Sequence, residues 1–158
     1  MKATFMIISL MSFFISFAQD SNSHFSYTES TTASPAIIWK LWTNTDLWPS
    51  WDSGLKKASL EGPFKIGAKG RITPDKGPKT TFLIRELSEN SRYKLEFKIP
   101  LGKLLLERRL KVENEKTYFT HEIQFTGPFK KVMGGKRYKK MLPKVMRQLK
   151  ELAEKESL

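Results

Sequence analysis

The chain of 158 residues contains no cysteine and carries 28 Lys and Arg residues against 16 Asp and Glu, a formal net charge of +12 at pH 7. The lack of cysteine excludes disulfide and thiol chemistry, and the two histidines, His24 and His121, lie far apart without the spacing of a metal site. No P-loop, nucleophile-elbow or dinucleotide-binding glycine pattern occurs. We therefore expect no metal and no other cofactor.

The N-terminal segment has the pattern of a secretory signal peptide. Lys2 precedes an almost wholly apolar run from Phe5 to Phe17, and small residues stand at the third and first positions before a cleavage site after Ala18. We predict that residues 1–18 are removed on export to a periplasmic or extracellular location. The alternative is an uncleaved N-terminal membrane anchor. Cleavage would leave 140 residues with a net charge of +11, enough for a single domain with a real core.

A strand and two short helices are predicted next. Residues 24–32 alternate weakly between polar and apolar, as a strand would. Ser34-Pro35 predicts a helix start, because Ser can cap a helix and Pro at the first helical position loses no needed hydrogen bond. A turn-rich second helix follows over residues 44–52.

All four tryptophans of the chain lie between Trp39 and Trp51. Such a block either fills the core or covers a cavity, because a residue of this size is rarely left in water. We expect Trp39 and Trp42 in the core. Trp51 and Phe64 lie near turns and are predicted at the mouth of a pocket.

Six further strands and a long amphipathic helix complete the chain. Gly, Pro, Asn and Ser turn signals separate the strands, which are predicted over residues 55–62, 68–75, 79–87, 91–99, 102–113 and 115–127. The helix is predicted from Pro128 onward, and residues 130–155 contain ten Lys and Arg against two Glu. Its apolar sector comprises Met141, Leu142, Val145, Met146, Leu149, Leu152 and Ala153, and its basic sector Lys136, Arg137, Lys139, Lys140, Lys144, Arg147 and Lys150. This order of elements predicts an α+β fold of about seven antiparallel strands closed by one helix.

Three hairpin turns give one consistent inner face of the sheet. A turn at Asn114-Glu115 places Arg108 opposite His121, and a turn at Leu101-Gly102 places Tyr93 opposite Leu110. A turn at Glu89-Asn90 pairs Phe82 with Phe97, Ile84 with Leu95, and Glu86 with Tyr93. The outer face is then charged, with Arg92, Lys94, Glu96, Lys98, Glu107, Arg109 and Lys111.

Arg108, His121 and Glu86 are thus predicted on an otherwise apolar face. A guanidinium in such a position is costly unless it is paired. One interpretation is a satisfied internal cluster, which is the commoner outcome for buried polar groups. The other is a cluster that orients a polar group of a bound ligand.

The sequence resembles the SRPBCC superfamily, which includes START-like, polyketide cyclase/dehydrase-like and birch-pollen-allergen-like proteins. The resemblance covers residues 24–156, a single predicted domain, and rests on the order of degenerate motifs: A-x-P-x-x-I-W-x-L from Ala33, W-P-x-W-D from Trp48, G-A-K-G from Gly67, T-H-x-I-x-F-x-G-P from Thr120 and L-x-x-L-A-E from Leu149. It implies a helix-grip fold, a bent antiparallel sheet wrapped around the C-terminal helix, with a deep apolar cavity. It also implies binding of lipids, sterols, polyketides or other hydrophobic molecules. The superfamily has no universal catalytic residue to transfer.

These features lead to one preferred function and two alternatives. The preferred function is an exported carrier of a hydrophobic small molecule or lipid, a monomer that does not bind nucleic acid. One alternative is a cyclase or isomerase with His121 as general base and Arg108 stabilising an oxyanion. The other is binding of an anionic surface through the basic helix. The predicted pocket residues are Trp51, Phe64, Phe82, Glu86, Tyr93, Phe97, Leu106, Arg108, Phe119, His121, Tyr138 and Met141.

Overall fold

The computed structural model of the protein describes residues 21–128, 130 and 135–158. The predicted signal peptide, residues 1–18, lies outside the described residues. Among the helices of the described ranges, none is long and apolar enough to cross a membrane.

One antiparallel sheet carries all the helices on one face. In chain order the described elements are β1 (His24–Thr31), α1 (Pro35–Thr43), the 3-10 helix η1 (Thr45–Leu47), α2 (Trp48–Trp51), β2 (Leu55–Leu60), β3 (Lys69–Pro74), β4 (Thr80–Ser88), β5 (Arg92–Ile99), β6 (Gly102–Glu113), β7 (Lys116–Thr126) and α3 (Gly135–Lys155). The strands lie in the order β1-β7-β6-β5-β4-β3-β2. Six consecutive strands therefore form a meander, and β1 joins its far edge beside β7.

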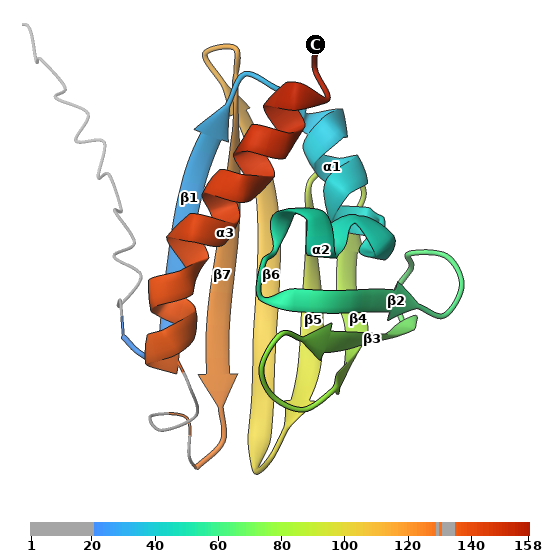
Figure 1. The fold of residues 1–158 in the computed structure, drawn as a ribbon, viewed down its shortest axis with the longest axis vertical. Helices are drawn as coiled ribbons and strands as arrows, with labels where there is room; N and C mark the ends of the chain where they lie inside the picture. Colours follow the sequence, from blue (N-terminus) through green and yellow to red (C-terminus); the bar gives the residue numbers. More distant parts are fainter. Residues whose placement is uncertain (1–20, 129, 131–134) are drawn as a thin grey trace, which may run out of the picture.

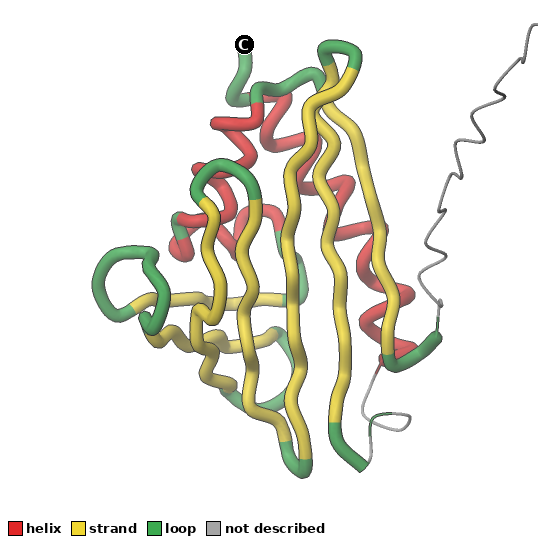
Figure 2. Tube along the Cα trace, turned by 180° about the vertical axis from the view of Figure 1, so that it is seen from behind, coloured by secondary structure: helices red, strands yellow, loops and turns green. Residues whose placement is uncertain are grey.

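The sheet curls around α3 in the manner of a helix-grip fold. The helix lies diagonally over β1, β7 and β6, and α1 and α2 cover the same face at the end where the chain terminates (Figure 1). Figure 2, seen from behind, shows that none of the described helices lies on the other face of the sheet. This arrangement confirms the predicted α+β architecture.

The strands β2 and β3 run across the direction of the longer strands (Figure 1). At this bend the backbone of β3 lies directly on the ring of Phe82, because a β-carbon at Gly70 would stand 2.1 Å from that ring. Only glycine admits so close an approach. The bend brings the loop between β3 and β4 to one end of the concave face.

The pairing of β6 with β7 is as predicted, with Arg108 opposite His121. The β5–β6 hairpin turns at Pro100-Leu101 instead of Leu101-Gly102, so that Tyr93 pairs with Arg108 and not with Leu110. Proline suits the first central position of a two-residue turn, and Leu101 adopts the positive φ of 59° that the second position requires. Because the register between β5 and β6 moves by two residues, the side chains of these two strands keep their predicted faces.

The prediction that Glu86 lies on the inner face is wrong. Phe82 pairs with Phe97 as predicted, but a register shift follows Ile84 and pairs Glu86 with Lys94. The extra residue of such a bulge reverses which side chains point inward beyond it. Glu86 consequently lies on the outer face, where its carboxylate contacts the ammonium of Lys94 at 2.9 Å.

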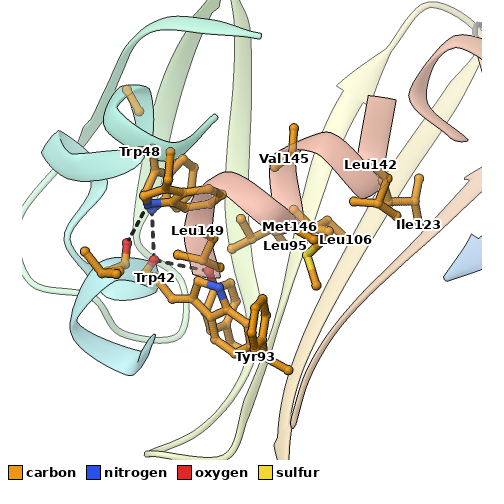
Figure 3. Packing of buried hydrophobic residues seen from close by; sticks show 14 of the residues in the cluster. Trp42, Trp48, Tyr93, Leu95, Leu106, Ile123, Leu142, Val145, Met146 and Leu149 are labelled. Carbon is orange, nitrogen blue, oxygen red and sulfur yellow. Dashed lines mark hydrogen bonds between the residues drawn. The ribbon is translucent and has the colours of Figure 1, made fainter. Parts of the chain in front are cut away.

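The long helix begins at Gly135, later than the predicted start, since Pro128 lies in a turn. It continues through Pro143 to Lys155. Five members of the predicted apolar sector are buried against the sheet, namely Leu142, Val145, Met146, Leu149 and Ala153. Figure 3 shows four of them facing side chains of the sheet. Of the basic sector, Lys136, Arg137, Lys140, Lys144 and Arg147 are exposed.

A candidate ligand cavity between the sheet and the C-terminal helix

A cavity of about 510 Å³ lies between the concave face of the sheet and α3. Its walls are mostly apolar, with Phe97, Leu104, Leu106, Ile123 and Phe125 from the sheet and Met141, Leu142 and Val145 from α3. Small-molecule pockets have volumes of about 300 to 1,000 Å³ and similarly apolar linings. The size and the lining therefore suit an apolar or amphipathic small molecule.

The exposed lining residues mark the mouth of this cavity. The β3–β4 loop, the end of β5 with the turn that follows it, and the first turn of α3 meet there. They contribute the basic residues Lys76, Lys79, Lys98 and Arg137. Beside them, Leu101 at the tip of the β5–β6 turn is 67% exposed. The mouth thus combines positive charge with exposed apolar surface.

Arg108 lies at the opposite, buried end of the cavity and is only 3% exposed. Its Nη1 donates a hydrogen bond to the hydroxyl of Tyr93, which in turn donates to the carbonyl oxygen of Trp42 at 3.1 Å. Burial raises the pKa of Tyr93 to about 12, so this hydroxyl keeps its proton at neutral pH. The guanidinium carbon lies 4.9 Å from the ring centre of Trp51 and 5.0 Å from that of Trp48. These rings attract the cation through their faces.

His121 lines the same end of the cavity and is 2% exposed. Its ring centre lies 5.5 Å from that of Trp42. Burial, together with the neighbouring charge of Arg108, holds the pKa of His121 well below its usual value. The imidazole is therefore neutral at neutral pH, and its buried Nε2 has no hydrogen-bond partner within the described residues.

Asp52 is the acidic residue in the described lining of the cavity. Its carboxylate accepts a hydrogen bond from the backbone N–H of Gly54 at 2.9 Å. Burial raises the pKa of Asp52, although the charge of Arg108 acts in the opposite direction. Asp52, Arg108 and His121 together make the inner end polar, in contrast to the apolar walls.

Three of the four tryptophans close the inner end. Trp42, Trp48 and Trp51 are each no more than 1% exposed, whereas Trp39 is only partly buried. The indole N–H of Trp48 donates to the carbonyl oxygen of Trp42 at 2.9 Å (Figure 3). The prediction of a core position is therefore confirmed for Trp42. The prediction that Trp51 lies at the mouth is wrong, because Trp51 packs behind Arg108 at the far end.

The predicted pocket residues divide into three groups. Six of them line the cavity: Phe97, Leu106, Arg108, His121, Tyr138 and Met141. Trp51, Phe82, Tyr93 and Phe119 belong instead to the packed core. Phe64 lies with its ring centre 4.9 Å from that of Tyr93, beside a surface depression next to α1 and η1, and Glu86 lies on the outer face.

Sequence reasoning missed Asp52 and the lysines of the mouth. The position of Asp52 directly after the tryptophan block was an available signal, because a carboxylate next to buried aromatics is itself drawn into the interior. Lys76 and Lys79 offered no such signal. Their place at the mouth depends on the bend that carries β2 and β3 across the sheet.

Comparison with known proteins agrees with this geometry. Residues 23–154 match the family described as polyketide cyclase / dehydrase and lipid transport. No curated protein matches the sequence.

Several solved structures share the fold. Protein MLL2253 from Mesorhizobium loti superimposes with a TM-score of 0.72 at 16% identity, covering 85% of this chain and 99% of its own. Major latex-like protein 151 from Panax ginseng gives a TM-score of 0.69 at 15% identity, covering 82% and 96%. Protein CV1439 from Chromobacterium violaceum gives 0.65 at 13% identity, covering 84% and 97%. At these identities the likeness concerns the fold alone.

The family match spans nearly all of the described residues, and the curled sheet around α3 is the fold that the SRPBCC resemblance implies. The chain therefore belongs to the polyketide cyclase / dehydrase and lipid transport family, within the SRPBCC superfamily.

Proposed function

We propose that this protein binds a hydrophobic small molecule in the cavity beneath α3 and acts as its carrier. The observation that carries the proposal is the apolar cavity of about 510 Å³, which opens at the basic mouth. Protein interiors are normally close-packed, and empty volume lowers stability. A large void bounded by ordered strands and a helix is therefore best explained by an occupant.

Uptake of the neutral dye Nile red, followed by fluorescence, tests this proposal. We expect saturable binding by the wild-type protein and its loss in Leu104→Trp, where the larger side chain fills the cavity. Val112→Trp is the matched control, because Val112 is 59% exposed and does not line the cavity. Native mass spectrometry of the purified protein should show a bound small molecule that Leu104→Trp lacks. A wild-type protein that takes up no dye and carries no small molecule would contradict the proposal.

The basic sector of α3 supports contact with an anionic lipid surface as a second function. Arg137 belongs both to this sector and to the mouth, and Lys140 and Lys144 continue the exposed charge along the helix. Such a surface attracts anionic headgroups with a strength of about 1 kcal/mol per basic residue. Contact at the mouth would place the cavity entrance against the source or destination of a lipid.

Vesicle sedimentation separates this function from simple solvation of a charged helix. We expect the protein to sediment with phosphatidylserine vesicles at low salt and not with phosphatidylcholine vesicles. The triple change Lys136→Gln, Lys140→Gln, Lys144→Gln should weaken sedimentation. The same number of changes at Lys57, Lys65 and Lys69, which are exposed on another part of the surface, should have a smaller effect. Equal effects of the two sets would contradict a role for α3.

The cyclase or isomerase alternative receives less support from the same site. His121 and Arg108 do lie side by side in the cavity wall. However, burial and the charge of Arg108 hold the pKa of His121 well below its usual value, which makes the imidazole a weak base. No carboxylate in the described residues hydrogen-bonds to the imidazole to orient it. We therefore favour binding over catalysis.

Export is the remaining part of the proposal. N-terminal sequencing of the protein from the native cell is expected to begin at Gln19, the residue after the predicted cleavage site. A protein that retains Met1 and sediments with membranes would favour the N-terminal anchor.

A further inference from the structure

The buried end of the cavity holds a cation, Arg108, that no carboxylate of the described residues pairs. Arg108 is 3% exposed and lines the cavity, yet among the described residues it forms no ion pair with a carboxylate. Removing a guanidinium from water is unfavourable unless an anion and hydrogen-bond acceptors replace the lost hydration. The guanidinium carbon lies over the rings of Trp48 and Trp51, which attract the cation but offer no oxygen acceptor for its N–H groups.

The hydrogen bonds of Arg108 leave one edge of the guanidinium free. Of its five N–H donors, Nη1 donates to the hydroxyl of Tyr93. Nε is buried without a partner within the described residues. The hydrogen bond from Nη1 is the one that Arg108 forms with the described residues, so Nη2, on the same edge as Nε, is unused as well. Two parallel N–H groups on one edge match the two oxygens of a carboxylate.

Asp52 does not fill this place. One oxygen of its carboxylate accepts from the backbone of Gly54, and it forms no ion pair with Arg108. Burial raises the pKa of Asp52 and thereby favours the protonated, neutral carboxyl group. The charge of Arg108 therefore remains available to a ligand.

We propose, on the basis of the ligand-binding function above, that the natural ligand is an acidic amphiphile with one carboxylate and a long apolar chain. The carboxylate lies on the free edge of Arg108, and the chain follows Leu106 and Leu104 toward the mouth. Arg108 and Leu104 are four residues apart on β6, roughly 13 Å at the rise of a strand, so an extended chain spans the apolar walls. The lysines of the mouth attract the acid before it enters.

Paired ligands of equal chain length test the proposal on the wild-type protein. Dodecanoic acid is expected to bind at least about tenfold more tightly than 1-dodecanol by calorimetry, because a hydrogen bond to a charged group is stronger than one to a neutral hydroxyl. The ¹³C-carboxyl resonance of bound dodecanoate should titrate at lower pH than that of the free acid, because Arg108 favours the charged form. Equal affinities for acid and alcohol would overturn the proposal and leave the carrier function standing. Failure of both ligands to bind would overturn the two together.

Variants then locate the carboxylate. Arg108→Met removes the charge-assisted hydrogen bonds to the carboxylate. We therefore expect the preference for dodecanoic acid over 1-dodecanol to fall to about threefold or less, while the affinity for 1-dodecanol stays the same. Arg71→Met, which removes an exposed arginine away from the cavity, should keep the full preference.

The opposite orientation, with the carboxylate at the mouth, gives a distinct pattern. In that case the double change Lys79→Met, Lys98→Met would abolish the preference and Arg108→Met would not, which would overturn the proposal. If Arg108→Met does not fold, Arg108→Lys retains the charge without the two-donor edge and is expected to bind the acid more weakly than the wild type.

Discussion

The two ends of the concave face are built in opposite ways. At the end covered by α1 and α2, Trp42, Trp48 and Trp51 fill the space between helix and sheet and are essentially unexposed. At the other end, beneath the first turns of α3, the same sheet bounds a cavity of about 510 Å³ with a basic mouth. The same sheet therefore has a packed half, which stabilises the fold, and an open half, which contains the cavity.

Arg108, His121 and Tyr93 lie at the boundary between the two halves. Arg108 and His121 line the inner end of the cavity, and Tyr93 lies in the core, where its hydroxyl accepts a hydrogen bond from Arg108. The aromatic rings of the packed end surround these residues. The tryptophans therefore do not line the cavity; Trp42, Trp48 and Trp51 instead pack around Arg108 at its polar inner end.

The largest effect is expected in the packed half. Trp48→Ala should lower the free energy of unfolding by about 3 to 5 kcal/mol, because it leaves a void among side chains that cannot close it. Leu104→Ala, on the cavity wall, should cost nearer 2 kcal/mol, since its side chain already borders empty space. Urea denaturation measures both changes. Equal losses at the two positions would contradict this difference between a closely packed end and a wall that borders empty space.

Tyr93→Phe is expected to have the next largest effect, because it acts at the boundary. The hydroxyl accepts from Arg108 and donates to the carbonyl oxygen of Trp42. Its removal leaves the buried guanidinium of Arg108 without its hydrogen-bond acceptor, whereas the carbonyl of Trp42 keeps the hydrogen bond from the indole of Trp48. The free energy of unfolding should therefore fall by about 1 to 3 kcal/mol. Tyr118→Phe is the control and should change little, because Tyr118 lies on the outer face of β7 between the buried Thr117 and Phe119. A neutral result for Tyr93→Phe would mean that water or a ligand replaces the hydroxyl.

Much of the open half was predictable from the sequence. Alternation along β6 and β7, with one correct turn, placed Arg108 beside His121, and these two residues do line the cavity. The pairing of Tyr93 with Arg108 was not predictable, because it depends on whether Pro100 or Gly102 stands at the hairpin turn. Both choices keep the same face buried, so the hydrophobic pattern cannot distinguish them.

Other features of the site depend on interactions that no local pattern reveals. The bulge after Ile84 turns Glu86 outward, and its outer position is reinforced by Lys94, a residue of the next strand. The position of Trp51 depends on how α2 packs against the sheet, since an aromatic residue near a turn suits the wall of a core as well as the rim of a pocket.

The response to pH distinguishes the boundary from the surface. The unfolded chain protonates His121 near its ordinary pKa of 6.5, whereas in the folded protein burial and Arg108 hold that pKa well below this value. Between these two values the unfolded state binds more protons, so stability is full above pH 6.5 and falls as the pH drops, by up to about 1.4 kcal/mol per pH unit. Asp52 acts with the opposite sign, because its pKa is raised above 3.8, and its contribution is lost as the pH rises.

Urea denaturation of the wild type and His121→Gln between pH 7 and pH 5 measures this dependence. In His121→Gln, the free energy of unfolding should fall less steeply between pH 7 and pH 5 than in the wild type, whatever the stability of the variant at pH 7. His24→Gln is the matched control, since His24 lies at the sheet edge, partly exposed and 2.6 Å from the carboxylate of Glu122. Parallel curves for the wild type and His121→Gln would contradict a buried neutral imidazole.

The smallest effect on the free energy of unfolding is expected at the mouth of the cavity, where a substitution should stabilise the protein. Leu101 adopts a φ of 59°, a left-handed conformation that leucine rarely takes, and its side chain is 67% exposed. Leu101→Asn should therefore raise the free energy of unfolding by up to about 1 kcal/mol, because asparagine tolerates this conformation better. Leu101→Ala removes the apolar side chain without relieving the strain and should give no increase. If the apolar tip serves contact with a lipid surface, both variants should also sediment less with phosphatidylserine vesicles. A destabilising Leu101→Asn would contradict the strain, and the mouth would then resemble the packed end in being optimised for stability.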